Sequence, residues 1–387
     1  MLEQLLNVLF NGLSTGSVLL IAALGLAIVF GLMGVINLAH GELMMLGAYT
    51  TYVVQNGFNA YAESLQDIYI FVALPLAFLV AALVGLLLER TVVRHLYGRP
   101  LETLLATWGV SLILIQFVRS VNAAMVLGLL LFAVLFLGGR FALKKATAPD
   151  WANPLLLLLS AAIAFVAGRV LNASDQNWLT LQWFGPRNID VTAPGWLQGG
   201  VSVGSTLQFP YARLFIIVLT VLCLLGIYWF LNRSVWGLRI RAVTQNRDMS
   251  ACLGIPTKTV DALTFALGSG LAGIAGSAIT LLGSVGPNLG GNYIVDAFMV
   301  VVVGGVGNIF GSVLAAFAIG TLSYLIGSGT LPLMLAGSGA ALQPVVDFFN
   351  FFAQSSMAKV MVFALFIAFL QVRPGGLFPQ KGRTADA

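Results

Sequence analysis

The sequence predicts an all-α, polytopic membrane protein with about 10–11 transmembrane or broken helices around a core with inverted-repeat character. Hydrophobic residues make up 59% of the 387 residues and charged residues only 9%, against about a quarter in a typical soluble protein. The mean hydropathy is +0.96. Runs such as 69–88 and 211–231 are almost free of charge and, at about 1.5 Å per residue, are long enough to cross a hydrocarbon core of ~30 Å.

The positions of lysine and arginine predict the orientation of these passes. None of the 19 precedes Arg90, so the N-terminus lacks the basic start of a signal peptide and is expected outside. Most of these 19 lysines and arginines fall in four segments that are expected inside: 89–102, 139–153, 232–259 and 372–387. The expected outer loops contain only Arg119 and Arg187.

The passes that fit this bias begin outside and end inside, in agreement with the basic tail. In order they are 5–33, 34–54, 69–88, 103–118, 123–138, 154–171, 211–231, 260–283, 293–304, 309–327 and 355–371. Two of them look broken. Pass 34–54 contains polar residues between glycines, and pass 293–304 is too short to span fully.

The first break lies in Gly31–Thr50, which reads GLMGVINLAHGELMMLGAYT. Asn37, His40 and Glu42 interrupt an apolar run here. A charged residue within a membrane segment is costly enough to indicate function, which applies to Glu42, whereas a histidine can be neutral and hydrogen-bonded. We expect the three side chains to line a pathway through the membrane.

The second break follows Asp296 and reads GGVGN at Gly304–Asn308. It repeats the order of the first break: apolar run, glycines, asparagine, glycine, apolar run. Such interrupted segments in two halves of a chain indicate a translocation site on an internal repeat, because unwound backbone in a bilayer must be hydrogen-bonded by protein or by water in a cavity. The expected hinge residues are Gly31, Gly34, Gly41, Gly304, Gly305 and Gly307.

Glycine also serves helix packing alone, and Gly268, Ala272 and Gly276 form a small-residue stripe of that kind. At the two breaks the asparagines favour the pathway interpretation, since an amide supplies both a donor and an acceptor. The expected pathway residues are Asn37, His40, Glu42, Thr107, Ser111, Asp296 and Asn308.

Residues 232–259 form the largest inner segment and end at Gly254 and Pro256. A short amphipathic helix is expected at about 240–253. Apolar residues alternate there with charged ones, which suggests docking to a partner. A solvated basic loop is the alternative.

Enzyme signatures do not accompany these features. The sequence has no GxxxxGK[ST] phosphate-binding loop, so we do not expect it to hydrolyse nucleotide itself, and it has neither HExxH nor a GxSxG elbow on a strand. Cys223 and Cys252 are not expected to form a disulfide, and His40 and His95 offer no metal-binding spacing. The net charge of +5 is explained by the inner loops and does not indicate nucleic acid.

Four stretches resemble a single family. Gly25–Tyr52 is similar to the permease subunits of ABC importers for branched-chain amino acids and urea. Gly237–Ser277 resembles the coupling loop of that family with its following helix, Asp296–Gly320 resembles its second glycine-rich segment, and Arg373–Arg383 (RPGGLFPQKGR) resembles its C-terminal signature.

The resemblance implies one transmembrane permease domain over 1–387, with a cytoplasmic coupling loop at 232–259. Residues 120–175 depart from the family pattern and look like an additional helix pair that shorter members lack. It implies a second homologous permease subunit, two ATPase subunits that bind ATP and Mg²⁺, a periplasmic substrate-binding protein and a place in the lipid of the bacterial cytoplasmic membrane. The chain itself is expected to bind no cofactor. The residues expected to meet an ATPase are Arg239, Arg241, Asn246, Arg247 and Gly254, although the glutamate of the general E-A-A-x-x-x-G pattern is missing.

The stretch NRDMSACLGI and the overall length look most like the urea subgroup, so urea is the expected substrate. Urea needs only neutral hydrogen-bond donors and acceptors, whereas a zwitterionic amino acid is expected to bind to a pair of opposite charges. The passes contain almost no mid-membrane basic residue, which favours urea. Import of branched-chain or other neutral amino acids by the same machinery is the alternative, and a passive channel for small neutral solutes is another. A membrane enzyme with His40 and Glu42 as an acid–base pair is disfavoured, since two residues apart on a helix they diverge by about 200°.

Overall fold

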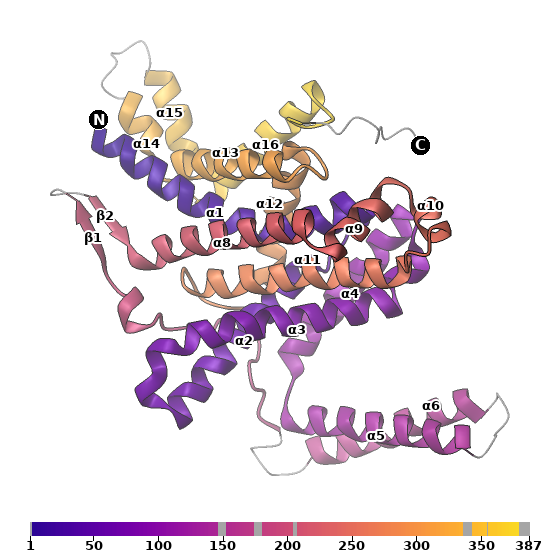
Figure 1. The fold of residues 1–387 in the computed structure, drawn as a ribbon. Coiled ribbons are helices and arrows are strands. Elements are labelled where there is room, and N and C mark those ends of the chain that lie inside the picture. The colour runs from indigo at the N-terminus through magenta and orange to yellow at the C-terminus, as the bar shows by residue number, and fades with distance from the viewer. Residues whose placement is uncertain are drawn as a thin grey trace. The chain divides into compact units, whose positions relative to one another are not determined.

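The computed structural model describes residues 2–145, 152–173, 180–203, 207–335, 343–353 and 355–378. Helices dominate this part of the chain (Figure 1). The α-helices are α1 (Leu2–Met33), α2 (His40–Tyr61), α3 (Tyr69–Thr91), α4 (Pro100–Ser120), α5 (Ala123–Lys145), α6 (Ala152–Asn172), α8 (Tyr211–Arg233), α9 (Val235–Gln245), α10 (Arg247–Cys252), α11 (Thr257–Thr280), α12 (Leu289–Gly304), α13 (Ile309–Gly327), α14 (Thr330–Leu335), α15 (Gln343–Phe352) and α16 (Ser355–Val372).

Short elements connect these helices. The 3₁₀ helices are η1 (Glu63–Ile68), η2 (Val93–Leu96) and η3 (Gly195–Leu197), and the strands are β1 (Gly200–Val203) and β2 (Leu207–Pro210). The two strands pair antiparallel, with Val201 opposite Phe209.

Eight helices among the described residues are long and apolar enough to cross a membrane. The bent pair Val346–Phe352 and Met357–Val372 adds a ninth span if it is counted as one. The predicted fold class is therefore confirmed. Two expected passes differ from these spans: 34–54 corresponds to α2, which carries many polar residues, and 293–304 corresponds to the short α12.

The chain divides into two compact units, which we describe separately. The first comprises Met1–Ser111 with Asp190–Ala387, and the second comprises Leu112–Ile189. In the second unit α5 and α6 pack against each other, and they occupy the region where an additional helix pair is expected. The first unit contains both predicted breaks and the predicted coupling loop.

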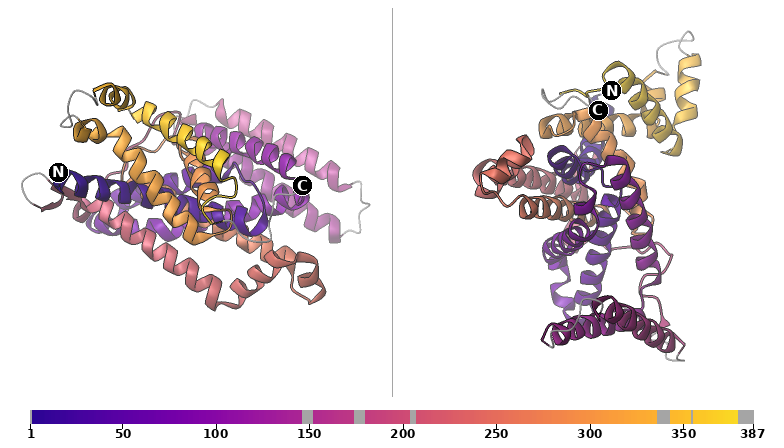
Figure 2. Two further views of the ribbon diagram at one scale, coloured as in Figure 1. Left: turned by 90° about the horizontal axis from the view of Figure 1, so that it is seen from above. Right: turned by 90° about the vertical axis from the view of Figure 1, so that its right-hand side faces the viewer.

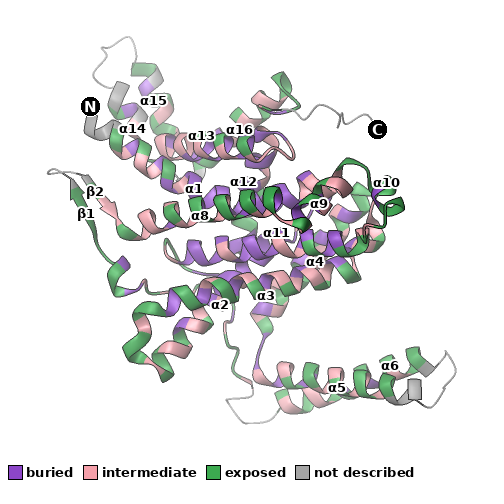
Figure 3. Ribbon diagram, viewed as in Figure 1, coloured by how far each residue is buried: buried purple, intermediate pink, exposed green. Residues whose placement is uncertain are grey.

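Helix α11 forms the centre of the first unit, where it packs against α1, α2 and α3. Most of α11 and α1 is buried (Figure 3). A Cβ on Gly268 would lie 2.7 Å from Gly25 O, and one on Gly276 would lie 2.8 Å from Met44 C, which no neighbouring backbone can accommodate. The small-residue stripe therefore serves close helix contact, as the sequence predicts.

Some predicted features lie outside the described residues. They are Lys381 and Arg383 of the basic tail, and residues 146–151 of the expected inner loop 139–153.

Candidate functional site

The first break is a short non-helical segment between α1 and α2, where the sequence predicts it. Gly34 follows α1 with a φ of +69°, a backbone conformation that favours glycine. Asn37 is 1% exposed, and its Oδ1 accepts a hydrogen bond from Ala39 N at 3.1 Å. The side chain thus forms a turn with the backbone two residues on, which leads into α2. Asn37 Nδ2 is buried and has no hydrogen-bond partner among the described residues.

Two residues of α4 complete the polar surroundings of this break. Thr107 Oγ1 accepts a hydrogen bond from Leu38 N at 3.1 Å, and Ser111 Oγ donates one to Glu42 Oε1 at 3.1 Å. All of these side chains are buried in the first unit. We call the group of Asn37, Glu42, Thr107 and Ser111 the polar seam. A narrow gap adjoins it, lined by Asn37, Thr107 and apolar residues that include Phe265.

His40 begins α2 but faces α1 instead of the polar seam. Its Nε2 lies 3.1 Å from Ala22 O, and its ring lies against Gly25, where a Cβ would be 2.9 Å from His40 Cε1. Glu42 hydrogen-bonds to α4, so the two side chains share no partner. This divergence, expected for residues two apart on a helix, leaves no acid–base pair.

The second break is built in a related way. Gly305 and Gly307 have φ values of +100° and +86° between α12 and α13. Asn308 is the N-cap of α13, and its Oδ1 accepts a hydrogen bond from Gly311 N at 3.1 Å. Each break therefore combines at least one glycine of positive φ with an asparagine whose side chain accepts a hydrogen bond from the backbone at the start of the next helix.

The two breaks touch each other in the first unit. A Cβ on Gly31 would lie 2.8 Å from Gly307 N, so only glycine permits this approach. The six predicted hinge glycines thus serve two different purposes. Gly34, Gly305 and Gly307 have positive φ, whereas Gly31, Gly41 and Gly304 lie against the backbone of Gly307, Gly290 and Ser312, respectively.

The C-terminal segment covers the second break, a role that sequence reasoning missed. Leu377 N donates a hydrogen bond to Val303 O at 2.8 Å, which satisfies a carbonyl at the end of α12. Gly376 has a φ of +77°, and a Cβ there would lie 2.6 Å from Val302 O. The ring of Phe378 packs 5.7 Å from that of Phe310. The glycine pair in RPGGLF was the available signal for such a close approach.

Asp296 lies apart from the polar seam. Its carboxylate faces α16, where Lys359 Nζ lies 3.2 Å from Asp296 Oδ2. The structure therefore groups four of the seven predicted pathway residues, and it places His40, Asp296 and Asn308 against other partners.

The inner segment 232–259 folds into two helices where one was expected at about 240–253. Asn246 separates them: its backbone is extended, and its Oδ1 accepts a hydrogen bond from Met249 N at 2.9 Å as the N-cap of α10. An asparagine that bonds to the backbone ahead of it starts a new helix and ends the previous one. Gly254, with a φ of +80°, follows α10.

The arginines of this segment contact residues of the same chain. The Arg239 guanidinium lies 4.8 Å from the ring centroid of Trp236, and Arg241 donates a hydrogen bond to Asn232 Oδ1 at 3.3 Å. Arg247 points inward to Asp261 and is described below. Four apolar side chains of α9, of α10 and of the residue after α10 are exposed, and we refer to them together as the α9–α10 apolar patch: Val235, Leu238, Met249 and Leu253.

A charged cluster connects α10 to the ends of α3 and α11. Arg247 Nη2 lies 2.5 Å from Asp261 Oδ2, and its guanidinium lies 4.7 Å from the ring centroid of Tyr97. Arg94 pairs at 3.0 Å with Glu89, whose side chain is fully buried. Burial, together with the nearby carboxylates of Asp261 and Glu89, raises the pKa of the Tyr97 phenol. The cluster holds α10 against the membrane-spanning helices.

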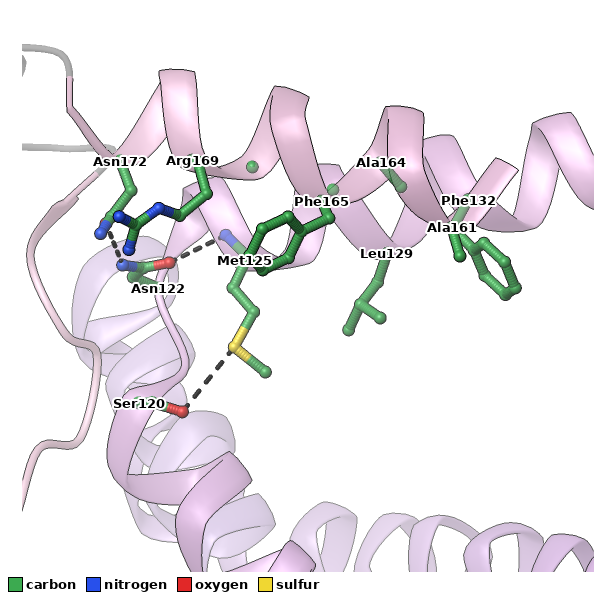
Figure 4. Close-up of a pocket in the computed structure, with 12 residues that line it drawn as sticks. Ser120, Asn122, Met125, Leu129, Phe132, Ala161, Ala164, Phe165, Arg169 and Asn172 are labelled. Atoms are coloured by element: carbon green, nitrogen blue, oxygen red, sulfur yellow. Dashed lines mark hydrogen bonds between the residues drawn. The ribbon is translucent and has the colours of Figure 1, made fainter. Parts of the chain in front are cut away.

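A cavity of about 740 Å³ lies in the second unit, between α5 and α6 (Figure 4). Its polar end is formed by Asn122, whose Nδ2 donates a hydrogen bond to Asn172 Oδ1 at 2.9 Å and whose Oδ1 accepts one from Met125 N. The rest of the lining is mostly apolar, and none of the predicted pathway residues lines it.

Comparison with known proteins gives one consistent family. The family described as "Branched-chain amino acid transport system / permease component" matches residues 8–370. The high-affinity branched-chain amino acid transport system permease protein BraD of Pseudomonas aeruginosa is 26% identical over 316 residues, which cover 81% of this chain and 84% of BraD. The permease protein LivH of Escherichia coli K12 is 26% identical over 320 residues, which cover 81% of this chain and 83% of LivH. No solved structure matches the chain.

Proposed function

The chain belongs to the family of permease components of branched-chain amino acid transport systems, and on that premise we propose that it carries branched-chain amino acids across the membrane. As a multi-pass permease component of an ABC importer, it is not itself an enzyme. The observation that carries the substrate proposal is that relatives named as branched-chain amino acid permeases align with more than four-fifths of the chain. They favour the amino acid alternative over urea, the expected substrate.

The proposed partners follow from the family. Two ATPase subunits, with ATP and Mg²⁺, would supply energy, a second homologous permease subunit would complete the pore, and a binding protein would deliver substrate at the outer face. We assign ATPase docking to the segment 232–259. The α9–α10 apolar patch supports this proposal, because exposed apolar side chains beside positive charge suit a protein partner better than solvent.

We place the route of the substrate through this chain along the polar seam and the two breaks. The N-terminus would lie outside and the C-terminus inside, in the cytoplasmic membrane, which puts both breaks toward the inner side. Closure of the ATPases would move α9 and α10. Their contact with α11 would then shift the two breaks at the Gly31–Gly307 contact and change which side of the membrane the seam faces.

The test is uptake by the complete importer reconstituted in vesicles, with labelled leucine and labelled urea compared under the same conditions. We expect leucine uptake that requires ATP, the ATPase subunits and the binding protein. Uptake of urea instead of leucine would overturn the substrate proposal. Uptake that persists without ATP or without the ATPase subunits would favour a passive channel.

A further inference from the structure

A second polar site lies in the first unit, away from the polar seam. It is a cavity of about 380 Å³ among α1, α12, α13 and α16. We propose that this cavity binds a free aliphatic amino acid as a zwitterion, with the ammonium group at Asp296 and the carboxylate at Lys359. The inference rests on the proposed function and deepens it, because it assigns a substrate site to this chain.

The charged groups of the cavity come from two helices far apart in sequence. Lys359 Nζ on α16 donates hydrogen bonds to Asp296 Oδ2 at 3.2 Å and to Asn292 O at 3.3 Å on α12. Asp296 is 9% exposed, whereas the Lys359 side chain is 52% exposed. A buried carboxylate in a membrane segment is costly and indicates function, and its paired cation supplies the second charge that a zwitterion requires.

The lining of the cavity suits a ligand with a charged end and an apolar end. Ligand cavities typically measure about 300–1,000 Å³, so this one has room for an amino acid. The hydroxyl-bearing residues of the lining include Tyr293, Ser323 and Tyr324, and the apolar ones include Leu19, Val362 and Phe363. Urea has neither full charges nor an apolar part, so it would use little of this lining. A branched aliphatic amino acid would use both kinds of surface.

The cavity also lies where a delivered substrate would arrive. Asp296 is in the first half of α12, Lys359 is near the start of α16, and Gly327 at the end of α13 lines the same cavity. In the proposed topology these three helix ends face outward, toward the binding protein. Helix α16 lies beside α13 and α12 (Figure 2), and it contributes Lys359 and Val362 to the lining of the cavity.

Site occupancy can be measured without transport. In the assembled importer with Cys223→Ser and Cys252→Ser, a Ser323→Cys variant is labelled with a water-soluble maleimide. We expect millimolar leucine to slow the labelling. Leucinamide and 4-methylpentanoate each lack one charge of the zwitterion, and we expect them to protect roughly tenfold less effectively, because each loses a charge-assisted hydrogen bond. Tyr61→Cys in the same background, at a 94% exposed position outside the cavity, is the control whose labelling leucine should leave unchanged.

Two charge-neutralising variants complete the test. Asp296→Asn and Lys359→Gln should each weaken protection by leucine roughly tenfold or more and lower leucine uptake. Glu102→Gln, which neutralises an exposed ion pair with Arg99, is the matched control and should change neither. Unchanged labelling of Tyr61→Cys and unchanged assembly with the ATPases show that the variants fold.

The outcomes separate this inference from the proposed function. If the importer takes up leucine but leucine does not protect Ser323→Cys, the inference fails while the function stands. Protection by phosphatidylethanolamine in the vesicles, with no further effect of leucine, would also overturn it, since the site would then hold a zwitterionic lipid headgroup. If the importer takes up no leucine, the proposed function itself fails.

Discussion

Charge reversal at Arg247 tests whether α10 is mechanically connected to the breaks. The side chain of its partner Asp261 is 5% exposed, whereas that of Arg247 is 43% exposed. Loss of one partner from a buried ion pair costs about 3–5 kcal/mol, and an exposed pair contributes only about 0–1 kcal/mol. For this half-buried pair we expect Arg247→Glu to cost about 2 kcal/mol, roughly a 30-fold shift away from the docked position of α10.

Packing explains how this shift reaches the breaks. Asp261 lies one turn before Phe265 on α11, and Phe265 belongs to a buried cluster with Val35 and Val93. Val35 lies within the first break, and Phe265 and Val93 line the gap beside Asn37. These side chains are closely packed, so a movement of α11 is passed on to the first break and the polar seam. If α10 separates from α11, a movement of α10 caused by the ATPases no longer reaches the polar seam as effectively.

The assay is ATP hydrolysis and leucine uptake by the reconstituted importer, with and without loaded binding protein. Arg247→Glu should lower the stimulation of hydrolysis by the binding protein and the amount of substrate moved per ATP, while the complex still assembles. Asp261→Arg in the same chain should restore part of both. Reversal of the exposed Arg99–Glu102 pair is the control and should have little effect. Normal stimulation in Arg247→Glu would refute this reasoning.

Three further predictions concern the breaks. Asn308→Leu should lower uptake and reduce the stability of the protein by about 1 kcal/mol because α13 loses its cap, whereas Asn308→Ser keeps a cap and should recover that stability in thermal unfolding. Asn37→Leu should also lower uptake. If neither Asn308→Leu nor Asn37→Leu changes transport, the breaks do not line the substrate route. Gly31→Ala should force the two breaks apart and reduce uptake severalfold. Gly57→Ala is the control and should leave uptake unchanged, because a Cβ there meets nothing within 4 Å. Equal uptake by the two variants would contradict the Gly31–Gly307 contact. Gly376→Ala should destabilise the C-terminal segment by about 1–2 kcal/mol because the φ of residue 376 is positive. Protease should then cut near residue 376 in the assembled complex more readily than in the control variant Gly226→Ala. Equal sensitivity of the two variants would show that the C-terminal segment does not depend on this glycine.

The sequence alone determined the membrane-spanning class and the positions of both breaks. Hydropathy, charge bias and clusters of glycine with asparagine are properties of short stretches, so they can be identified before any helix is placed. For the same reason the resemblance at Gly25–Tyr52 indicated the permease family, which the match over residues 8–370 establishes. The substrate subgroup was a weaker inference, because it depended on a short stretch of the inner loop.

Only the tertiary structure decided which side chains meet. Asn37 and Thr107 lie 70 positions apart in sequence, yet both bond the backbone at 38–39, whereas Asp296 turns away to α16. In the sequence, the scarcity of basic residues in mid-membrane positions argued against a zwitterionic substrate. The fold nevertheless brings Lys359 to Asp296, so that a positive and a negative side chain meet. Residue type fixes what a group can bond to, and the packing of helices distant in sequence selects the partner from the many that residue type allows.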